Sequence, residues 1–76
     1  MHETSTEKLN QIVADILELD INAVSDALTP DDVEQWTSLN HLRLVTAVEE
    51  AFGISLSMEQ IESIRSIGAL RQLVCT

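Results

Sequence analysis

The chain of 76 residues is poor in several residue types, and each shortage excludes a class of protein. With one cysteine, Cys75, it forms no internal disulfide, and its two histidines, His2 and His41, are too far apart for a zinc site of the usual Cys/His spacing. The only aromatic side chains are Trp36 and Phe52. We therefore expect an aliphatic core and no platform for stacking nucleic-acid bases. The length leaves room for a single domain, which we expect to span residues 1–76.

Basic residues are also scarce. Four lysines and arginines oppose thirteen acids, which gives a net charge of −9, and nine of these acids precede Arg43. Such a chain repels phosphate backbones and anionic membrane surfaces. We therefore expect no nucleic-acid binding and no membrane insertion, and the longest uncharged stretches are far shorter than the ~20 apolar residues of a span. The polar, acidic start differs from a secretion signal, so we expect a cytoplasmic protein, which we take to be a monomer.

Apolar residues recur with helical spacing along the whole chain. The pattern predicts helices over about Ser5–Leu19, Ser38–Phe52 and Met58–Ile64, and a fourth helix after Ser66 with Ile67, Leu70, Leu73 and Val74 on its buried side. No strand is predicted. The expected fold class is therefore all-α, a small four-helix bundle with three longer helices and one short helix.

Capping residues mark the expected helix ends. The capping-box spacing, a hydroxyl residue followed three positions later by Glu or Gln, occurs at Thr4 with Glu7 and at Ser57 with Gln60. Further helix-end signals are the predicted N-caps Thr37 and Ser66 and the predicted left-handed C-terminal residue Gly53.

A long connection from Asp20 to Thr37 separates the first two predicted helices. It is rich in turn and breaker residues. Connections of this length usually carry function or pack as a shaped loop. Five apolar residues spaced through it are expected to anchor it on the core: Ile21, Val24, Ala27, Leu28 and Val33.

Two familiar kinds of site are rejected. Ser38 and His41 lie three apart at a helix start, but a serine hydrolase also needs an oriented base, an oxyanion hole and a cleft. We therefore expect no catalytic residue. An EF-hand calcium loop counted from Asp20 would place Val24 at position 5 and Ser25 at position 6, where an acidic or amide residue and glycine are needed. We expect no metal site.

Covalent modification of Ser38 is a third possibility. A hydroxyl in the first turn of a helix, after a long acidic loop, is accessible to another enzyme. A phosphodiester at this position would lie near unpaired backbone N–H groups and the positive end of the helix dipole.

Two segments resemble the acyl carrier protein family. The first, residues 28–54, contains the pair Ser38-Leu39 and the helix end Glu49–Phe52, and the second, residues 58–70, contains the junction of Ile64 with Ser66 and Ile67. The similarity extends over nearly the whole chain and includes its length, its acidity and its plan of three longer helices and one short helix. The resemblance implies a bundle of acyl-carrier type with a long first loop, and a shuttle with no active site.

The resemblance also implies a cofactor and partners. A separate, magnesium-dependent phosphopantetheinyl transferase would move 4′-phosphopantetheine from coenzyme A to Ser38. The thiol of this arm would carry an acyl group as a thioester between loading and transfer enzymes, in fatty-acid, polyketide or modified-lipid biosynthesis. An amino-acyl or peptidyl carrier and an unmodified helical interaction module are the alternatives. Helix faces that could part to shelter an acyl chain include Val48, Phe52, Leu56, Ile61 and Ile64.

The chain departs from the usual family pattern around Ser38. Thr37 stands where an aspartate usually precedes the serine, and polar or basic residues replace acids at the start of the second helix. The acidic residues lie upstream instead. The sequence of Trp36–Leu42 is similar to that of free-standing, specialised carriers. The expected partner-binding residues are Asp31, Asp32, Glu34, Thr37, Leu39, His41 and Arg43.

The net charge leads to a first testable prediction. A charge of −9 on so small a body destabilises the fold by self-repulsion at neutral pH and low ionic strength. Added salt or magnesium should therefore raise the melting temperature, measured by circular dichroism. An unchanged or lower melting temperature would refute this.

Overall fold

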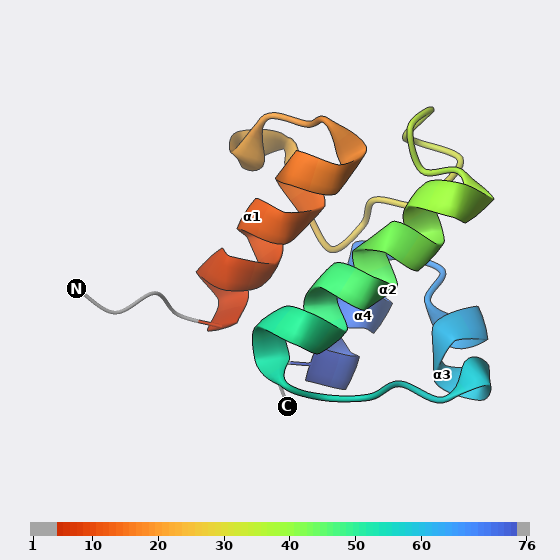
Figure 1. The fold of residues 1–76 in the computed structure, drawn as a ribbon. Coiled ribbons are helices and arrows are strands. Elements are labelled where there is room, and N and C mark those ends of the chain that lie inside the picture. The colour runs from red at the N-terminus through yellow and green to blue at the C-terminus, as the bar shows by residue number, and fades with distance from the viewer. Residues whose placement is uncertain (1–4, 75–76) are drawn as a thin grey trace.

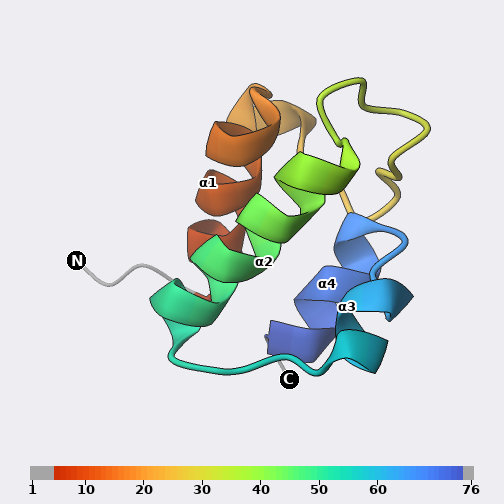
Figure 2. The ribbon, with the colours of Figure 1, turned by 45° about the vertical axis from the view of Figure 1, so that its right-hand side comes forward.

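A computed structural model describes residues 5–74 as four α-helices. They are α1 (Ser5–Leu17), α2 (Ser38–Phe52), α3 (Met58–Ser63) and α4 (Ile67–Val74), and a 3₁₀ turn, η1 (Ile21–Ala23), lies in the first connection. Helices α1 and α2 run side by side in opposite directions (Figure 1). Figure 2 shows α1 on one side of α2, and α3 and α4 on the other. Residues 5–74 contain no strand, so the all-α, four-helix prediction is confirmed.

The first helix is shorter than predicted. It ends at Leu17 instead of Leu19, because Glu18 takes up a left-handed conformation with φ 55°. The Leu19 N–H then donates to the Ala14 carbonyl at 2.9 Å, which closes the last turn. Spacing alone does not reveal a non-glycine residue in this conformation. The predicted cap Thr4 lies outside the described residues.

The long connection follows the prediction in part. Its start is the η1 turn, which the sequence pattern missed and which Asp20 caps by accepting from the Asn22 N–H at 2.8 Å. Ile21 begins this turn and is 42 % exposed, and Ala27, in a surface turn, is exposed as well. These two were wrongly predicted as anchors, because the two turns leave their side chains at the surface. The three predicted anchors that pack on the core are Val24, Leu28 and Val33.

Helix α2 begins and ends at the predicted residues. The Thr37 side chain accepts a hydrogen bond from the Asn40 N–H at 3.2 Å, which makes Thr37 the N-cap. At the other end Gly53 has φ 65° and its N–H donates to the Glu49 carbonyl. This conformation costs a glycine little, so the helix stops there. Ser38 is thereby fixed as the first residue of α2.

The two short helices also have the predicted caps. Ser57 and Gln60 form the predicted capping box, with hydrogen bonds of 2.8 and 3.1 Å between each side chain and the other residue's backbone N–H. Helix α3 ends at Ser63, one residue before the predicted end, because Ile64 is already extended (ψ 90°). Ser66 caps α4 by accepting from the Ala69 N–H at 3.1 Å.

The core is aliphatic apart from one indole, as the composition predicts. Each helix except the one-and-a-half-turn α3 contributes fully buried side chains, and the connection contributes Val33 and Trp36. The largest fully buried side chains are Leu9, Leu17, Leu44, Ile67, Leu70, Val13 and Val48. Burial of this kind stabilises the fold by about 1.5–3 kcal/mol for each large aliphatic side chain.

The start of α4 holds the long connection in place. The first two N–H groups of α4, on Ile67 and Gly68, donate to the carbonyls of Leu28 and Asp26, both at 3.0 Å. A Cβ on Gly68 would lie only 3.1 Å from the Asp26 carbonyl oxygen, so glycine allows this close approach. Arg71 adds hydrogen bonds of 2.7 Å to the Asp26 carboxylate and to the Asn10 side chain, which links the connection to α4 and α1.

Lys8 of α1 stabilises the end of α2, which generates a second prediction. Its ammonium group donates to the Ala51 carbonyl at 2.7 Å and lies 5.1 Å from the centre of the Phe52 ring. A cation at this end of a helix also interacts favourably with the helix dipole. Lys8→Met keeps the apolar stem and removes the charge, so it should lower the free energy of unfolding by about 1 kcal/mol. Urea denaturation would measure the loss, and Lys8→Arg should restore part of it. Equal stability of wild type and Lys8→Met would show that the contact contributes nothing.

Candidate functional site

The site is centred on Ser38, which lies at the surface. It is exposed and is the first residue of α2. Thr37, one residue before it, fixes the direction in which the helix begins through its capping bond to Asn40. The structure therefore presents the Ser38 hydroxyl at the amino-terminal end of a 15-residue helix.

The backbone around Ser38 suits an anion. Within residues 5–74 the N–H groups of Ser38 and Leu39 have no hydrogen-bond partner, whereas those of Asn40 and His41 donate to Thr37. Two free donors therefore lie beside the Ser38 hydroxyl, at the positive end of the α2 dipole. A phosphodiester on this hydroxyl would find both hydrogen-bond donors and a favourable field. The residues present thus fit a phosphate-linked group.

Three of the other serines are less suited to modification. The hydroxyls of Ser57, Ser63 and Ser66 are used in helix caps and turns. In contrast, no hydrogen bond of the Ser38 hydroxyl is seen within the described part of the chain, and Ser38 borders a cavity.

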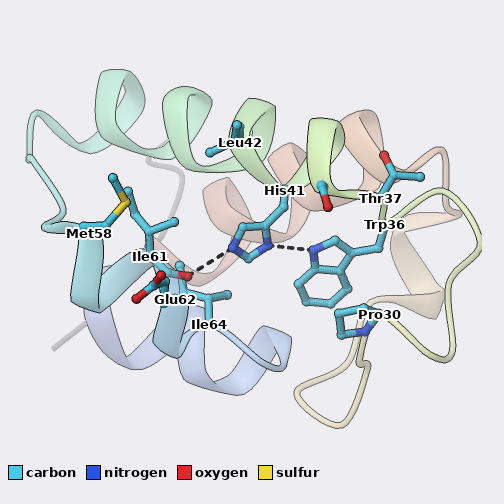
Figure 3. A pocket seen from close by; sticks show the side chains of 10 residues that line it. Pro30, Trp36, Thr37, His41, Leu42, Met58, Ile61, Glu62 and Ile64 are labelled. Carbon is cyan, nitrogen blue, oxygen red and sulfur yellow. Dashed lines mark hydrogen bonds between the residues drawn. The ribbon is translucent and has the colours of Figure 1, made fainter.

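A groove opens beside Ser38, between the start of α2 and α3 (Figure 3). It has a volume of about 410 Å³ and its walls are mostly apolar. Its lining residues come from the connection, from α2 and from the region of α3: Pro30, Trp36, Thr37, Ser38, His41, Leu42, Met58, Ile61, Glu62 and Ile64. The groove is therefore assembled from segments that are distant in sequence.

His41 joins the walls of this groove. Its ring reaches from α2 toward α3 and lies between Trp36 and Ile61 (Figure 3). The Trp36 indole N–H donates to Nδ1 of His41 at 2.9 Å, and Nε2 lies 3.1 Å from the Ile61 carbonyl. Because an indole only donates and a carbonyl only accepts, these contacts require a neutral ring with its proton on Nε2. The indole and imidazole planes are nearly parallel, at 17°, with centroids 6.1 Å apart, so the rings meet edge to edge through this hydrogen bond.

This geometry argues against Ser38 and His41 as a catalytic pair, the arrangement considered from the sequence. Both ring nitrogens of His41 are used within the protein, so the ring has no free nitrogen to take a proton from Ser38. Within residues 5–74 no three or more His, Cys, Asp or Glu side chains gather where they could hold a metal ion. No helix in that range is long and apolar enough to cross a membrane.

The predicted partner-binding residues occupy three places. The upstream acids Asp31, Asp32 and Glu34 are exposed on the connection, and Asp32 is occupied in accepting from the backbone and hydroxyl of Thr29, both at 3.1 Å. Leu39, Arg43 and the N-cap Thr37 are exposed at the start of α2, and Leu39 is 65 % exposed. His41 is half-buried and faces inward. A role of these residues in partner binding stays a prediction.

Several groove residues escaped the sequence analysis. Leu42 and Met58 are 56 and 72 % exposed, and with Leu39 they give the site an apolar rim. Their spacing on amphipathic helices is also typical of core positions, so no sequence signal separated rim from core. The pairing of Trp36 with His41 was missed as well, because five-residue spacing across a helix start indicates no particular contact.

Comparisons with known proteins agree with this geometry. The model of a family described as "phosphopantetheine attachment site" matches residues 7–74. Among solved structures, a candidate acyl carrier protein from Mycobacterium tuberculosis superposes with a TM-score of 0.81 at 25 % sequence identity, over 91 % of this chain and 92 % of that chain. A comparison with curated protein sequences gives no significant match.

These findings confirm the bundle of acyl-carrier type, the phosphopantetheine cofactor and the expectation that the chain is not an enzyme. Attachment of phosphopantetheine implies a phosphopantetheinyl transferase as a partner. The groove and the free N–H groups at the start of α2 are in keeping with such an arm. The chain belongs to the phosphopantetheine attachment site family, whose members are non-catalytic carriers.

Proposed function

We propose that this chain is an acyl carrier protein that holds acyl intermediates as thioesters on a 4′-phosphopantetheine arm attached to Ser38. The pathway would be fatty-acid, polyketide or modified-lipid biosynthesis. The observation that carries the proposal is the placement of Ser38, an exposed hydroxyl at the start of α2 and beside the apolar groove, in a chain of the phosphopantetheine family. The similarity in fold to a candidate acyl carrier protein supports acyl cargo.

The residues around Ser38 have distinct parts in this function. Thr37 orients the first turn of α2 so that the serine oxygen is open to the transferase. When the arm is attached, its phosphate would accept from the free N–H groups of Ser38 and Leu39. The arm supplies a terminal thiol, which carries the acyl group as a thioester. The domain supplies a rigid, recognisable base for the arm.

We assign partner docking to the surface around this attachment point. Leu39 and Arg43 lie exposed on α2, and the acids Asp31, Asp32 and Glu34 lie exposed on the connection before it. Loading and transfer enzymes approach the arm at this end of the bundle, so both groups lie within their footprint. The single-domain organisation, the monomeric state and the cytoplasmic location remain predictions of the sequence.

The attachment site is tested by replacing the serine. Ser38→Ala should abolish the gain of one phosphopantetheinyl group when the chain is incubated with coenzyme A, magnesium and a broad-specificity phosphopantetheinyl transferase. The exposed hydroxyl makes no hydrogen bond within residues 5–74, and alanine is a good helix former, so the fold should be unchanged. Intact-mass spectrometry measures the gain, and circular dichroism checks the fold.

Three outcomes are informative. A gain on the wild type alone supports Ser38. A gain on Ser38→Ala as well places the arm on another residue. No gain on either chain, repeated with a transferase from the source organism, would favour an unmodified helical interaction module. If the arm is attached, the acid that the cognate loading enzyme transfers separates acyl from amino-acyl or peptidyl cargo.

Thr37 gives a further prediction about the transferase. The family's usual aspartate at this position meets a basic group of the transferase, so Thr37→Asp should raise kcat/KM for loading by the broad-specificity enzyme roughly two- to fivefold, the worth of one exposed ion pair. Asparagine caps a helix as well as aspartate does but carries no charge. Thr37→Asn should therefore leave the rate near that of the wild type. Equal rates for the Asp and Asn variants would contradict recognition through charge.

A further inference from the structure

The space between α2 and α3 is closed on its inner side, and this bears on the cargo. We propose that His41, held by Trp36 and Ile61, is a gate that keeps the acyl group in the outer groove and so limits the cargo to a short, apolar acyl chain. The inference rests on the proposed attachment to Ser38 and names the class of cargo that this site takes. It departs from the expectation that the helix faces part to shelter an acyl chain.

The evidence for the gate is the pair of hydrogen bonds that the His41 ring forms. The ring lies one helical turn after Ser38 and spans the gap between α2 and α3 (Figure 3). It accepts from the Trp36 indole at 2.9 Å and donates to the Ile61 carbonyl at 3.1 Å. A chain that passed inward beside His41 would have to separate α3 from α2 and break these bonds. It would leave a half-buried indole N–H and a carbonyl without partners, which is costly.

The interior behind the gate is filled. Trp36 lines the groove, is only 5 % exposed and belongs to the buried core cluster. The core cluster to which Trp36 belongs, and against which Ile61 packs, also contains Leu44 and Val48 of α2 and Ile67 and Leu70 of α4, all fully buried. Protein cores are close-packed and accept extra methylene groups only with strain.

The outer groove, in contrast, is open and small. Its volume of about 410 Å³ lies near the lower end of the roughly 300–1,000 Å³ typical of small-molecule sites. Part of that volume would be taken by the end of the arm. Leu42, Met58 and Pro30 supply apolar walls, and Glu62, which is exposed, lines the same groove with its carboxylate-bearing side chain. This carboxylate, in a chain of net charge −9, disfavours an acyl group that ends in a second carboxylate.

The test loads the full chain with acyl groups of increasing length. A broad-specificity phosphopantetheinyl transferase transfers the arm from acetyl-, butyryl-, octanoyl- or hexadecanoyl-coenzyme A, and intact mass confirms each product. The melting temperature and the fluorescence of Trp36, the single tryptophan, are then compared. We expect octanoyl and butyryl forms to melt within about 2 °C of each other and to share one emission maximum. A buried octanoyl chain would raise the melting temperature by more than about 10 °C, and that rise would overturn the gate.

Variants test the residues of the gate. His41→Ala removes both hydrogen bonds, and Trp36→Phe removes only the indole donor while an aromatic ring remains. In either variant the octanoyl form should melt at least 5 °C above the butyryl form, because the smaller side chain and the lost hydrogen bond make room for the chain between α2 and α3. Thr46→Ala is the matched control, since Thr46 is exposed on the same helix and its hydroxyl donates only to the Leu42 carbonyl, at 3.0 Å. Thr46→Ala should behave as the wild type.

The outcomes separate the gate from the carrier function. If the variants are loaded but their melting temperature does not depend on the length of the acyl group, the gate is overturned and the carrier function stands. A failure of every acyl-coenzyme A and of coenzyme A itself to load the wild type would overturn both. A melting temperature that depends on the length of the acyl group in His41→Ala and Trp36→Phe, but not in the wild type, supports the gate.

Discussion

The site depends on the two hydrogen bonds of His41. Its surroundings come from three segments: the connection that ends in Trp36, the first turn of α2 and the short helix α3. From its place on α2, the His41 imidazole forms hydrogen bonds to Trp36 of the connection and to the Ile61 carbonyl of α3. A helix as short as α3 has little stability of its own, so its position relative to Ser38 depends on such tertiary contacts.

The other side of the site is held by a helix that takes no part in it. Helix α4 binds the connection through the N–H groups of Ile67 and Gly68 and through Arg71. These contacts satisfy donors that a helix start would otherwise leave free, and they fix the path of the chain before Pro30 and Trp36. The start of α2 keeps its own N–H groups of Ser38 and Leu39 unused within the described residues. The N–H groups at the start of α4 therefore have a structural role, whereas those at the start of α2 are available to a phosphate.

Charge and apolar surface are separated around Ser38. Apart from Glu62, which lines the groove, the acids named above lie on the connection, whereas Leu39 beside Ser38 and the groove residues Leu42 and Met58 are all more than half exposed. No acidic residue occurs in α2 before Glu49. If partner enzymes dock at this end of the bundle, as proposed, they meet the exposed Leu39, Leu42 and Arg43 at the start of α2.

Much of this protein was determined by its sequence alone, because the signals are local. The helices, the caps Thr37, Ser57, Ser66 and Gly53, and the exposed serine at a helix start follow from periodicity and capping chemistry, which depend on residues within one or two turns. The family resemblance added the phosphopantetheine arm. The remaining features depend on contacts between segments that are distant in the sequence. The left-handed Glu18, the outward Ile21 and Ala27, and the inward His41 with its bonds to Trp36 and Ile61 are fixed by packing, for which spacing carries no signal. The groove belongs to this second group, because its walls are brought together only when α3 and the connection pack against α2.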